Sequence, residues 1–349
     1  MSGVTDTVFF GLVHDFLKVH LPSQRGCSVH TIRAYQSALN AMLHFVKTDK
    51  GIGLNEVAFE MIDSVMISAF LDSIEMNGCS VSTRNHRLNC IRSFYAYAAK
   101  MNPIAVVHQA EIYKVPHKKA VTPTAINYMS ENAIKALLEQ PDAKTKKGLR
   151  DKFLMLLMYD TGARVQEVLG IRVCDIHLGK TPTVTLIHTK GSKTRTVPLM
   201  RQTVEFYGAY RKAYHSDKSD SSACYLFYVP MRGEDLKMDD STVRKFMASY
   251  GLAAKAVCPE VPSKVHPHLL RHSRAMHLYQ HGMDLLLVSQ WLGHAHLDTT
   301  LIYAHADTEH KRKAIEKSTP QDSPLRNSRD SMRYTVNDEE TLKKLYGLS

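Results

Sequence analysis

The sequence lacks any apolar stretch long enough to cross a lipid bilayer. Its longest apolar run, Phe153 to Tyr159, is far shorter than the roughly 20 residues that a membrane helix needs. Residues 1–10 also lack the basic segment and following apolar segment of a secretion signal. We therefore expect a cytosolic protein with no membrane partner.

Cysteine is scarce and scattered. The six cysteines stand at positions 27, 79, 90, 174, 224 and 258 and form no C-x-x-C pair. Structural zinc sites and disulfide frameworks need closely spaced cysteines, so the pattern disfavours both. We expect reduced, partly buried thiols.

Acidic residues are outnumbered by lysine and arginine, which gives the chain a net charge of +11 and a pI of 9.2. This balance favours a polyanionic partner. The 349 residues are 44% hydrophobic, which is ordinary for a soluble globular protein of this length and suggests two domains.

The N-terminal hundred residues show helical periodicity throughout. Amphipathic segments at residues 5–20, 28–47, 60–77 and 80–102 predict a helical bundle. The second and fourth segments carry no acidic residue, which is what a DNA-facing surface needs. The arginines proposed to face the duplex are Arg33, Arg84, Arg87 and Arg92. A solvated basic face is the alternative interpretation.

Residues 103–129 contain three prolines and the basic run 117–119, with no clear apolar stripe. This composition predicts an extended linker. We expect it to cross DNA, with Lys118 and Lys119 contacting phosphate. A second domain is predicted from residue 130.

An anion-binding pattern begins at Pro267. Proline suits the first position of a helix, so His268 and Arg271, three residues apart, share the face beside its positive end. Free backbone N–H groups, an imidazole and a guanidinium together form a site for phosphate.

Two further short helices are predicted after this one. Gly282 breaks the first, Asp284 can cap the second, and Gly293 ends it with His294 in the turn. Tyr303 then lies about one and a half turns into the third.

These residues closely resemble the C-terminal motif of the tyrosine recombinase (phage integrase) family. The matching runs are His268-Leu-Leu-Arg271-His272, Leu292-Gly293-His294 and Thr299-Thr300-Leu-Ile-Tyr303-Ala-His305. Upstream, Asp160-Thr-Gly-Ala-Arg164-Val-Gln-Glu167 resembles the first arginine box of the family, and Thr189-Lys190-Gly-Ser-Lys193-Thr-Arg195 resembles the hairpin that carries its lysine. All six catalytic positions of the family are filled.

The resemblance implies strand exchange on double-stranded DNA at a specific recombination site, without metal, ATP or another cofactor. Tyr303 would attack a phosphate and form a 3′-phosphotyrosyl bond. The implied roles are transition-state stabilisation by Arg164, Arg271 and His294, general acid catalysis by Lys190 with Lys193 as the competitor, assistance by His268 as base or oxygen ligand, and support from Glu167 and His272.

The expected fold is mainly α-helical, with a helical core-binding domain at residues 1–102, the linker, a mixed α/β catalytic domain at 130–317 and a tail at 318–349. β-like runs at 171–177, 183–189 and 194–200 predict a small antiparallel sheet. By resemblance the two domains form a C-clamp on DNA, and a terminal helix at 338–348 docks either on its own domain or on a neighbour in a homotetramer on two sites.

Several alternatives stay open. His268 with His272, and His277 with His281, have the i,i+4 spacing of a helical zinc site. A non-catalytic DNA-binding regulator and a type IB topoisomerase are further candidates. Within the family, we expect integration or transposition of a mobile element, with Xer-like resolution of chromosome or plasmid dimers second.

Overall fold

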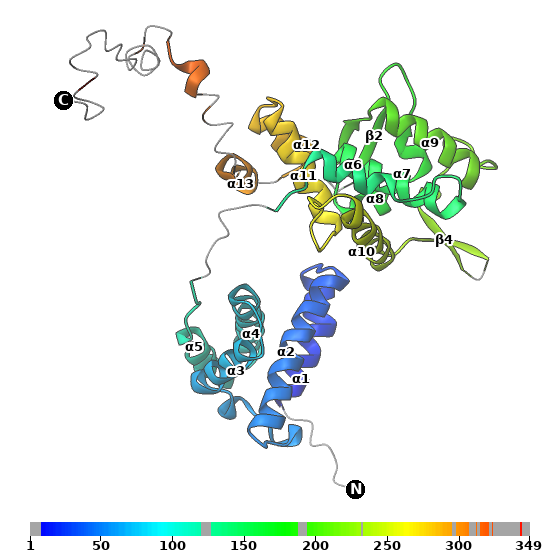
Figure 1. Ribbon diagram of the computed structural model, residues 1–349. Helices are drawn as coiled ribbons and strands as arrows, with labels where there is room; N and C mark the ends of the chain where they lie inside the picture. The colour runs from blue at the N-terminus through cyan, green and yellow to red at the C-terminus, as the bar shows by residue number, and fades with distance from the viewer. Residues whose placement is uncertain are drawn as a thin grey trace. The chain divides into compact units, whose positions relative to one another are not determined.

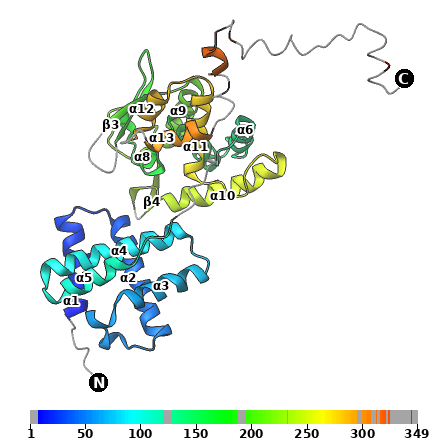
Figure 2. The same ribbon diagram turned by 90° about the vertical axis from the view of Figure 1, so that its left-hand side faces the viewer.

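The computed structural model describes residues 8–119, 127–187, 194–231, 233–294 and 298–306, with a few positions beyond residue 311. The chain divides into two compact units, Met1–Thr122 and Pro123–Ser349 (Figures 1 and 2). Each unit has its own hydrophobic core. In these described ranges, no helix is long and apolar enough to span a membrane.

The first unit is a bundle of helices. They are α1 (Val8–Asp15), which continues as the π-helix η1 (Phe16–Gln24), α2 (Val29–Asp49), α3 (Ser64–Met76), α4 (Val81–Met101) and α5 (Ile104–Lys114). The hydroxyls of Ser28 and Ser80 accept hydrogen bonds from the backbone N–H groups of Thr31 and Thr83. These caps start α2 and α4 where the sequence predicted them.

Aromatic rings fill the centre of this bundle. Phe94 of α4 packs edge-on against Phe9, Phe16 and Tyr95, with ring centroids 5.5, 5.6 and 5.5 Å apart. All four side chains are buried. Burial of each such ring stabilises a fold by about 1.5–3 kcal/mol, so this cluster joins α1, η1 and α4.

Helix α5 differs from the sequence-based expectation. The extended linker predicted from residue 103 is wrong for residues 104–114, which are helical and bury Ala105 and Ile112 in the core of the first unit. The helix can begin here because Pro103 precedes its first turn, where no backbone N–H is needed. Residues 115–119 then follow without regular structure.

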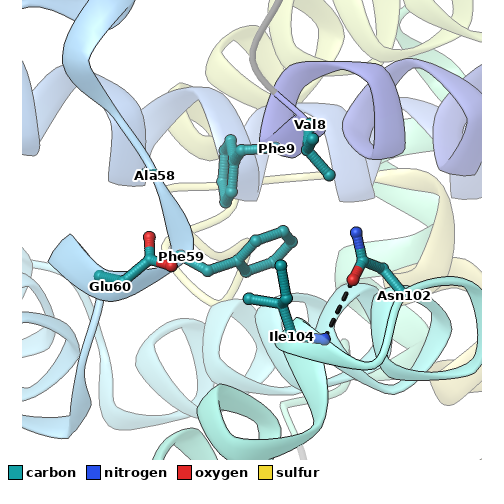
Figure 3. A pocket seen from close by; sticks show the side chains of 7 residues that line it. All are labelled: Val8, Phe9, Ala58, Phe59, Glu60, Asn102 and Ile104. Atoms are coloured by element: carbon teal, nitrogen blue, oxygen red, sulfur yellow. Dashed lines mark hydrogen bonds between the residues drawn. The ribbon is translucent and has the colours of Figure 1, made fainter.

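A pocket of about 220 Å³ opens on the first unit between Phe9, Phe59 and Ile104 (Figure 3). Its rim includes Asn102, whose side-chain oxygen accepts a hydrogen bond from the Ile104 N–H at 3.0 Å. The lining is mainly apolar and contains none of the predicted catalytic residues. Those residues all belong to the second unit.

The second unit combines helices with a small sheet. Its helices are α6 (Glu131–Glu139), α7 (Lys146–Thr161), α8 (Val165–Leu169), α9 (Arg201–Tyr214), α10 (Asp240–Val257), α11 (Pro267–Gln280), α12 (Leu285–Leu292) and α13 (Asp298–Ala306). Its strands are β1 (Ile176–His177), β2 (Thr183–Ile187), β3 (Thr194–Pro198), β4 (Tyr228–Met231) and β5 (Glu234–Lys237).

Strands β1, β2 and β3 form the predicted antiparallel sheet in that order. β2 and β3 pair in the register Val184↔Val197, and both valines are buried in the core of the unit. The strand expected at 171–177 is reduced to two residues, because residues 173–175 form a 3₁₀ turn. β4 and β5 form a separate hairpin that the sequence analysis did not predict.

The candidate site lies where three helix ends meet. Helix α11 packs on α7 and on α12, and α13 packs on both α11 and α12. Figure 2 shows α11, α12 and α13 grouped together. Helix α11 carries His268 and Arg271, the turn after α7 leads to Arg164, and the turn after α12 leads to His294. The helix contacts therefore bring these distant parts of the sequence together.

Candidate active site

Arg271 of α11 connects its own motif segment to the segments that carry Arg164 and His294. Its guanidinium donates from Nη1 to the Gly162 carbonyl at 2.6 Å and from Nη2 to the Leu292 carbonyl at 2.8 Å. Gly162 lies two residues before Arg164, and Leu292 two residues before His294. The residue is only 4% exposed, so these bonds fix the guanidinium between the ends of α7 and α12.

Glycine is required at both turns that Arg271 meets. Gly162 has φ +60° and Gly293 has φ +66°, a region that other residues rarely adopt. A Cβ at Gly162 would also lie 2.9 Å from Leu292 Cδ2, and one at Gly293 would lie 2.8 Å from Arg195 Nη1. Both conformation and space therefore select glycine here.

Glu167 binds the arginine of the first arginine box, Arg164, and also Arg195. This carboxylate is 2% exposed and accepts hydrogen bonds from both Arg164 and Arg195 at 2.8 to 3.2 Å. Burial alone would raise its pKa, but the hydrogen bonds and charges of Arg195 and Arg164 lower the pKa to about 2. Glu167 is thus an anion at neutral pH and holds the two arginines in place.

The cluster as a whole remains positive. Burial, followed by the charge of Arg164, lowers the pKa of Arg271 to about 10, so the guanidinium is still charged at pH 7. Among the described residues, no carboxylate forms an ion pair with Arg271. Arg164 and Arg195 share the Glu167 carboxylate, and Arg271 adds a third guanidinium close to them, an arrangement suited to a bound anion.

His294 is oriented by a threonine that the sequence analysis did not single out. Its Nδ1 lies 2.7 Å from the Thr300 hydroxyl of α13. Burial, and then the charges of Arg271 and Arg164, lower the pKa of His294 to about 4. A neutral imidazole held in this way can donate one hydrogen bond to a phosphate oxygen.

Tyr303 lies inside the cluster of α11, α12 and α13, packed among Met276, Val288 and Leu292. It is 1% exposed, and its hydroxyl is 2.9 Å from Nδ1 of His272. Burial raises the pKa of Tyr303 despite the charges of Arg271 and Arg164. The phenol is therefore protonated at pH 7, and its side chain is covered in this structure.

The two histidines of α11 take different positions. His272 is half-buried and contacts the phenol, whereas His268 is exposed, with its ring centroid 6.4 Å from that of His272. Burial, and then the charges of His268 and Arg271, lower the pKa of His272 to about 4, so its imidazole is neutral at pH 7. Within the described part of the chain, no three His, Cys, Asp or Glu side chains gather as a metal site.

Comparison with known proteins places this geometry in a family. The sequence matches the phage integrase family over residues 127–310, more than half of the chain, and the phage integrase N-terminal SAM-like domain over residues 14–102. The chain belongs to the phage integrase family of tyrosine recombinases. It is a site-specific recombinase.

Individual relatives agree with this assignment. A protein of Sinorhizobium fredii named as an integrase/recombinase is 33% identical over 314 residues, covering 88% of this chain and 91% of the relative. Tyrosine recombinase XerC of Thermodesulfovibrio yellowstonii is 31% identical over 325 residues, covering 91% of this chain and 98% of the relative.

Solved structures share the fold. XerH recombinase in a post-cleavage complex with palindromic difH matches with a TM-score of 0.62 and 23% identity, covering 90% of each chain. The Tn1549 transposon integrase bound to transposon right-end DNA matches with a TM-score of 0.61 and 16% identity, covering 87% of this chain and 98% of that one.

The lysines expected to protonate the leaving group, Lys190 and Lys193, lie outside the described residues. So does the terminal helix expected at 338–348. The strands on either side of the lysine segment are described, and their last pair is Ile187↔Thr194. Arg195, at the end of the same motif run, has a side chain that is only 15% exposed and reaches Glu167.

The DNA-facing role predicted for Arg84 in this recombinase needs correction. Arg84 is 4% exposed, lies 3.4 Å from Glu75 and donates to the Pro116 carbonyl at 3.0 Å. Contrary to the expectation, it lies four residues before Leu88 and so shares the buried face of α4, where the chain after α5 reaches it through the Pro116 carbonyl. Its guanidinium is paired with Glu75 and bonded to the Pro116 carbonyl, which assigns it to holding this part of the chain rather than to DNA.

Other proposed DNA contacts in the first unit divide into two groups. Arg92 donates to the carbonyls of Tyr113 and Val115 at 3.0 and 2.6 Å, and Lys118 forms an ion pair with Glu75 at 2.6 Å. Arg92 therefore holds the chain after α5 against α4, and Lys118 ties the same segment to α3. Arg33 and Lys119 are exposed and Arg87 is half-buried, so these three remain candidates for DNA contact.

Proposed function

We propose that this recombinase binds duplex DNA at a specific site and exchanges strands through a 3′-phosphotyrosyl intermediate. The observation that carries the proposal is the buried Arg271, which joins three motif segments in a cluster with surplus positive charge and lies beside the helices that bury Tyr303. A phenol with a pKa near 10 is a poor nucleophile at pH 7, and neighbouring cations are what it needs to react.

Each step has an assigned group. Tyr303 attacks the phosphorus, and the 5′ oxygen leaves with a proton from Lys190, or from Lys193 as the competitor. Arg164, Arg271 and His294 stabilise the pentavalent transition state, and His268 assists as base or oxygen ligand. The bond energy is kept in the protein–DNA link, so a 5′ hydroxyl of a partner strand can reverse the reaction without ATP.

The assembly is a further part of the proposal. The two units hold duplex DNA as a C-clamp, and four protomers act on two sites, with the terminal segment 338–348 docking on a neighbour or on its own unit. One of the fold neighbours is a lambda integrase tetramer bound to a Holliday junction, which supports this arrangement.

The first candidate role is integration or transposition of a mobile element. Similarity to the integrase/recombinase of S. fredii supports it. Similarity to XerC over almost its whole length supports the second candidate, resolution of chromosome or plasmid dimers.

A capture experiment tests the proposal and identifies the DNA site at the same time. The protein is incubated with DNA of its host, covalent complexes are trapped with detergent, and the attached ends are sequenced. Wild-type protein should capture one recurrent sequence, and Tyr303→Phe should capture none. Ends of a mobile element indicate integration, a single chromosomal locus indicates resolution, and random sites indicate a topoisomerase. Absence of adducts from wild type contradicts the proposal.

A further inference from the structure

Arg195 has no role in the reaction assigned above, yet it is one of the most constrained arginines of the second unit. Its Nη1 and Nη2 donate to the two carboxylate oxygens of Glu167 at 3.2 and 2.8 Å, and its Nε donates to the Trp291 carbonyl at 3.1 Å. All three nitrogens thus donate to protein acceptors. These bonds fix the guanidinium against Glu167 and the end of α12.

The same guanidinium packs against the turn that carries His294. A Cβ added to Gly293 would lie 2.8 Å from Nη1 and 3.2 Å from Cζ of Arg195. Only the missing side chain of Gly293 allows this approach. One arginine therefore contacts the end of α12 and, through Glu167, the Arg164 box.

Arg195 also fixes the end of the sheet. It pairs with Leu186 across β2 and β3, one pair before Ile187↔Thr194, from which the segment carrying Lys190 and Lys193 extends. Side chains alternate along a strand, and Arg195 shares the inward side of β3 with the buried Val197. The strand pair is thus anchored to the catalytic cluster by a charged side chain as well as by apolar packing.

We propose that Arg195 is a positioning residue that sets the lysine-bearing strand pair against Arg164 and the His294 turn. The inference rests on the proposed function, because it requires a lysine of that segment to protonate the leaving group. Loss of Arg195 should then impair leaving-group protonation and transition-state stabilisation together. A guanidinium suits this task, since its planar fork binds two carboxylate oxygens and a third acceptor at once.

The test uses two cleavage substrates that differ at one atom. Each carries the site recovered by the capture experiment, with either oxygen or sulfur at the 5′ leaving position. A thiol, with a pKa of about 8.5, leaves as an anion without a proton, so sulfur removes the need for a general acid. Single-turnover cleavage is measured for Arg195→Ala, Arg195→Lys, Lys190→Ala and Lys193→Ala. Arg201→Ala, at a side chain that is 93% exposed, is the control.

Arg195→Ala should slow cleavage of the oxygen substrate at least roughly 100-fold, by analogy with positioned groups whose misplacement costs about that much. On the sulfur substrate, Arg195→Ala should recover at least tenfold of that loss. Lys190→Ala or Lys193→Ala, whichever removes the general acid, should recover more. Arg195→Lys should lie closer to Arg195→Ala than to wild type. Equal losses on both substrates, or no loss on either, would overturn the role of Arg195.

The lysine variants separate this result from the proposed function. If neither is rescued by sulfur, the assignment of a lysine acid fails, and the coupling inferred for Arg195 fails with it. Hydrogen exchange of the β2–β3 amides in free protein needs no DNA. Exchange should be faster in Arg195→Ala than in Arg201→Ala, and equal rates would contradict the anchoring.

Discussion

Two groups of arginines in this recombinase make similar hydrogen bonds but serve different ends. Arg84 and Arg92 of α4 bind carbonyls of residues 113–116, just as Arg271 binds the carbonyls of Gly162 and Leu292. Hydrogen bonds to carbonyls therefore show that an arginine side chain is fixed in place. They do not show whether that arginine also binds an anion.

The balance of charge separates the two groups. In the first unit, Arg84 and Lys118 share Glu75, and Asp72 lies 3.9 Å from Lys118, so these two cations face two carboxylates, while Arg92 bonds to carbonyls. In the second unit, Glu167 faces both Arg164 and Arg195, and Arg271 has no carboxylate partner among the described residues. A surplus of buried positive charge is what distinguishes a phosphate site from a structural anchor.

The largest expected effect is at Arg271. Arg271→Ala should slow cleavage by about 10³ to 10⁵, as loss of a positioned arginine does in phosphoryl transfer. Arg271→Lys should recover only part of this rate, because one ammonium cannot bind both carbonyls and a phosphate. Single-turnover cleavage measures both variants. A rate within about tenfold of wild type, or roughly 1.4 kcal/mol, would remove Arg271 from the reaction.

Arg84 should show the opposite pattern. Arg84→Ala removes the contact that holds Pro116 against α4, so the first unit should lose about 1–3 kcal/mol of unfolding free energy. Cleavage at saturating DNA should be unchanged. Urea unfolding followed by circular dichroism measures the loss, with Arg33→Ala as the exposed control. Unchanged stability together with weaker DNA binding would restore Arg84 as a DNA contact.

Acid should affect the catalytic cluster through its histidines. The pKa values of His272 and His294 are about 4, below the ordinary 6.5 of an unfolded chain. Between these values the unfolded state binds the extra protons, so unfolding free energy should fall as pH is lowered from 6.5 to 4, by at most about 1.4 kcal/mol per pH unit for each histidine.

The single tryptophan of the chain, Trp291, lies in α12 and reports this transition by fluorescence. The slope should be shallower in His272→Gln than in wild type, because one titrating group has been removed. Parallel pH profiles for the two proteins would show that His272 is not the group that resists protonation.

Arg33 carries the smallest predicted effect. Arg33→Ala should reduce the slope of log affinity against log salt by about one unit if the exposed guanidinium contacts a phosphate. Affinity for the captured site, measured at several salt concentrations, tests this. An unchanged slope and an unchanged sequence preference would mean that this face of α2 does not meet DNA.

The catalytic segments could be predicted from sequence because local signals fix them. Pro267 opens α11, Gly162 and Gly293 end α7 and α12 with positive φ, and Asp284 caps α12. Each places its motif residue at a helix end with little help from distant contacts. The small sheet followed from its alternating pattern in the same way.

The features that escaped prediction depend on contacts remote in sequence. Arg84 donates to the Pro116 carbonyl, 32 residues further along, a contact that a basic stripe does not announce, although its spacing of four residues from Leu88 placed it on the buried face. Helix α5 was missed because the prolines around it suggested a linker. Arg195 could have been recognised, since it shares a strand face with Val197.

The most direct test of the proposed chemistry is to identify the residue that becomes joined to DNA. A nicked duplex with the captured site traps the covalent complex, nuclease removes most of the DNA, and mass spectrometry locates the remaining nucleotide. We predict a nucleotide linked through its 3′ phosphate to Tyr303, and no adduct in Tyr303→Phe. A nucleotide on Tyr279 or another residue, or a 5′ linkage, would contradict this mechanism.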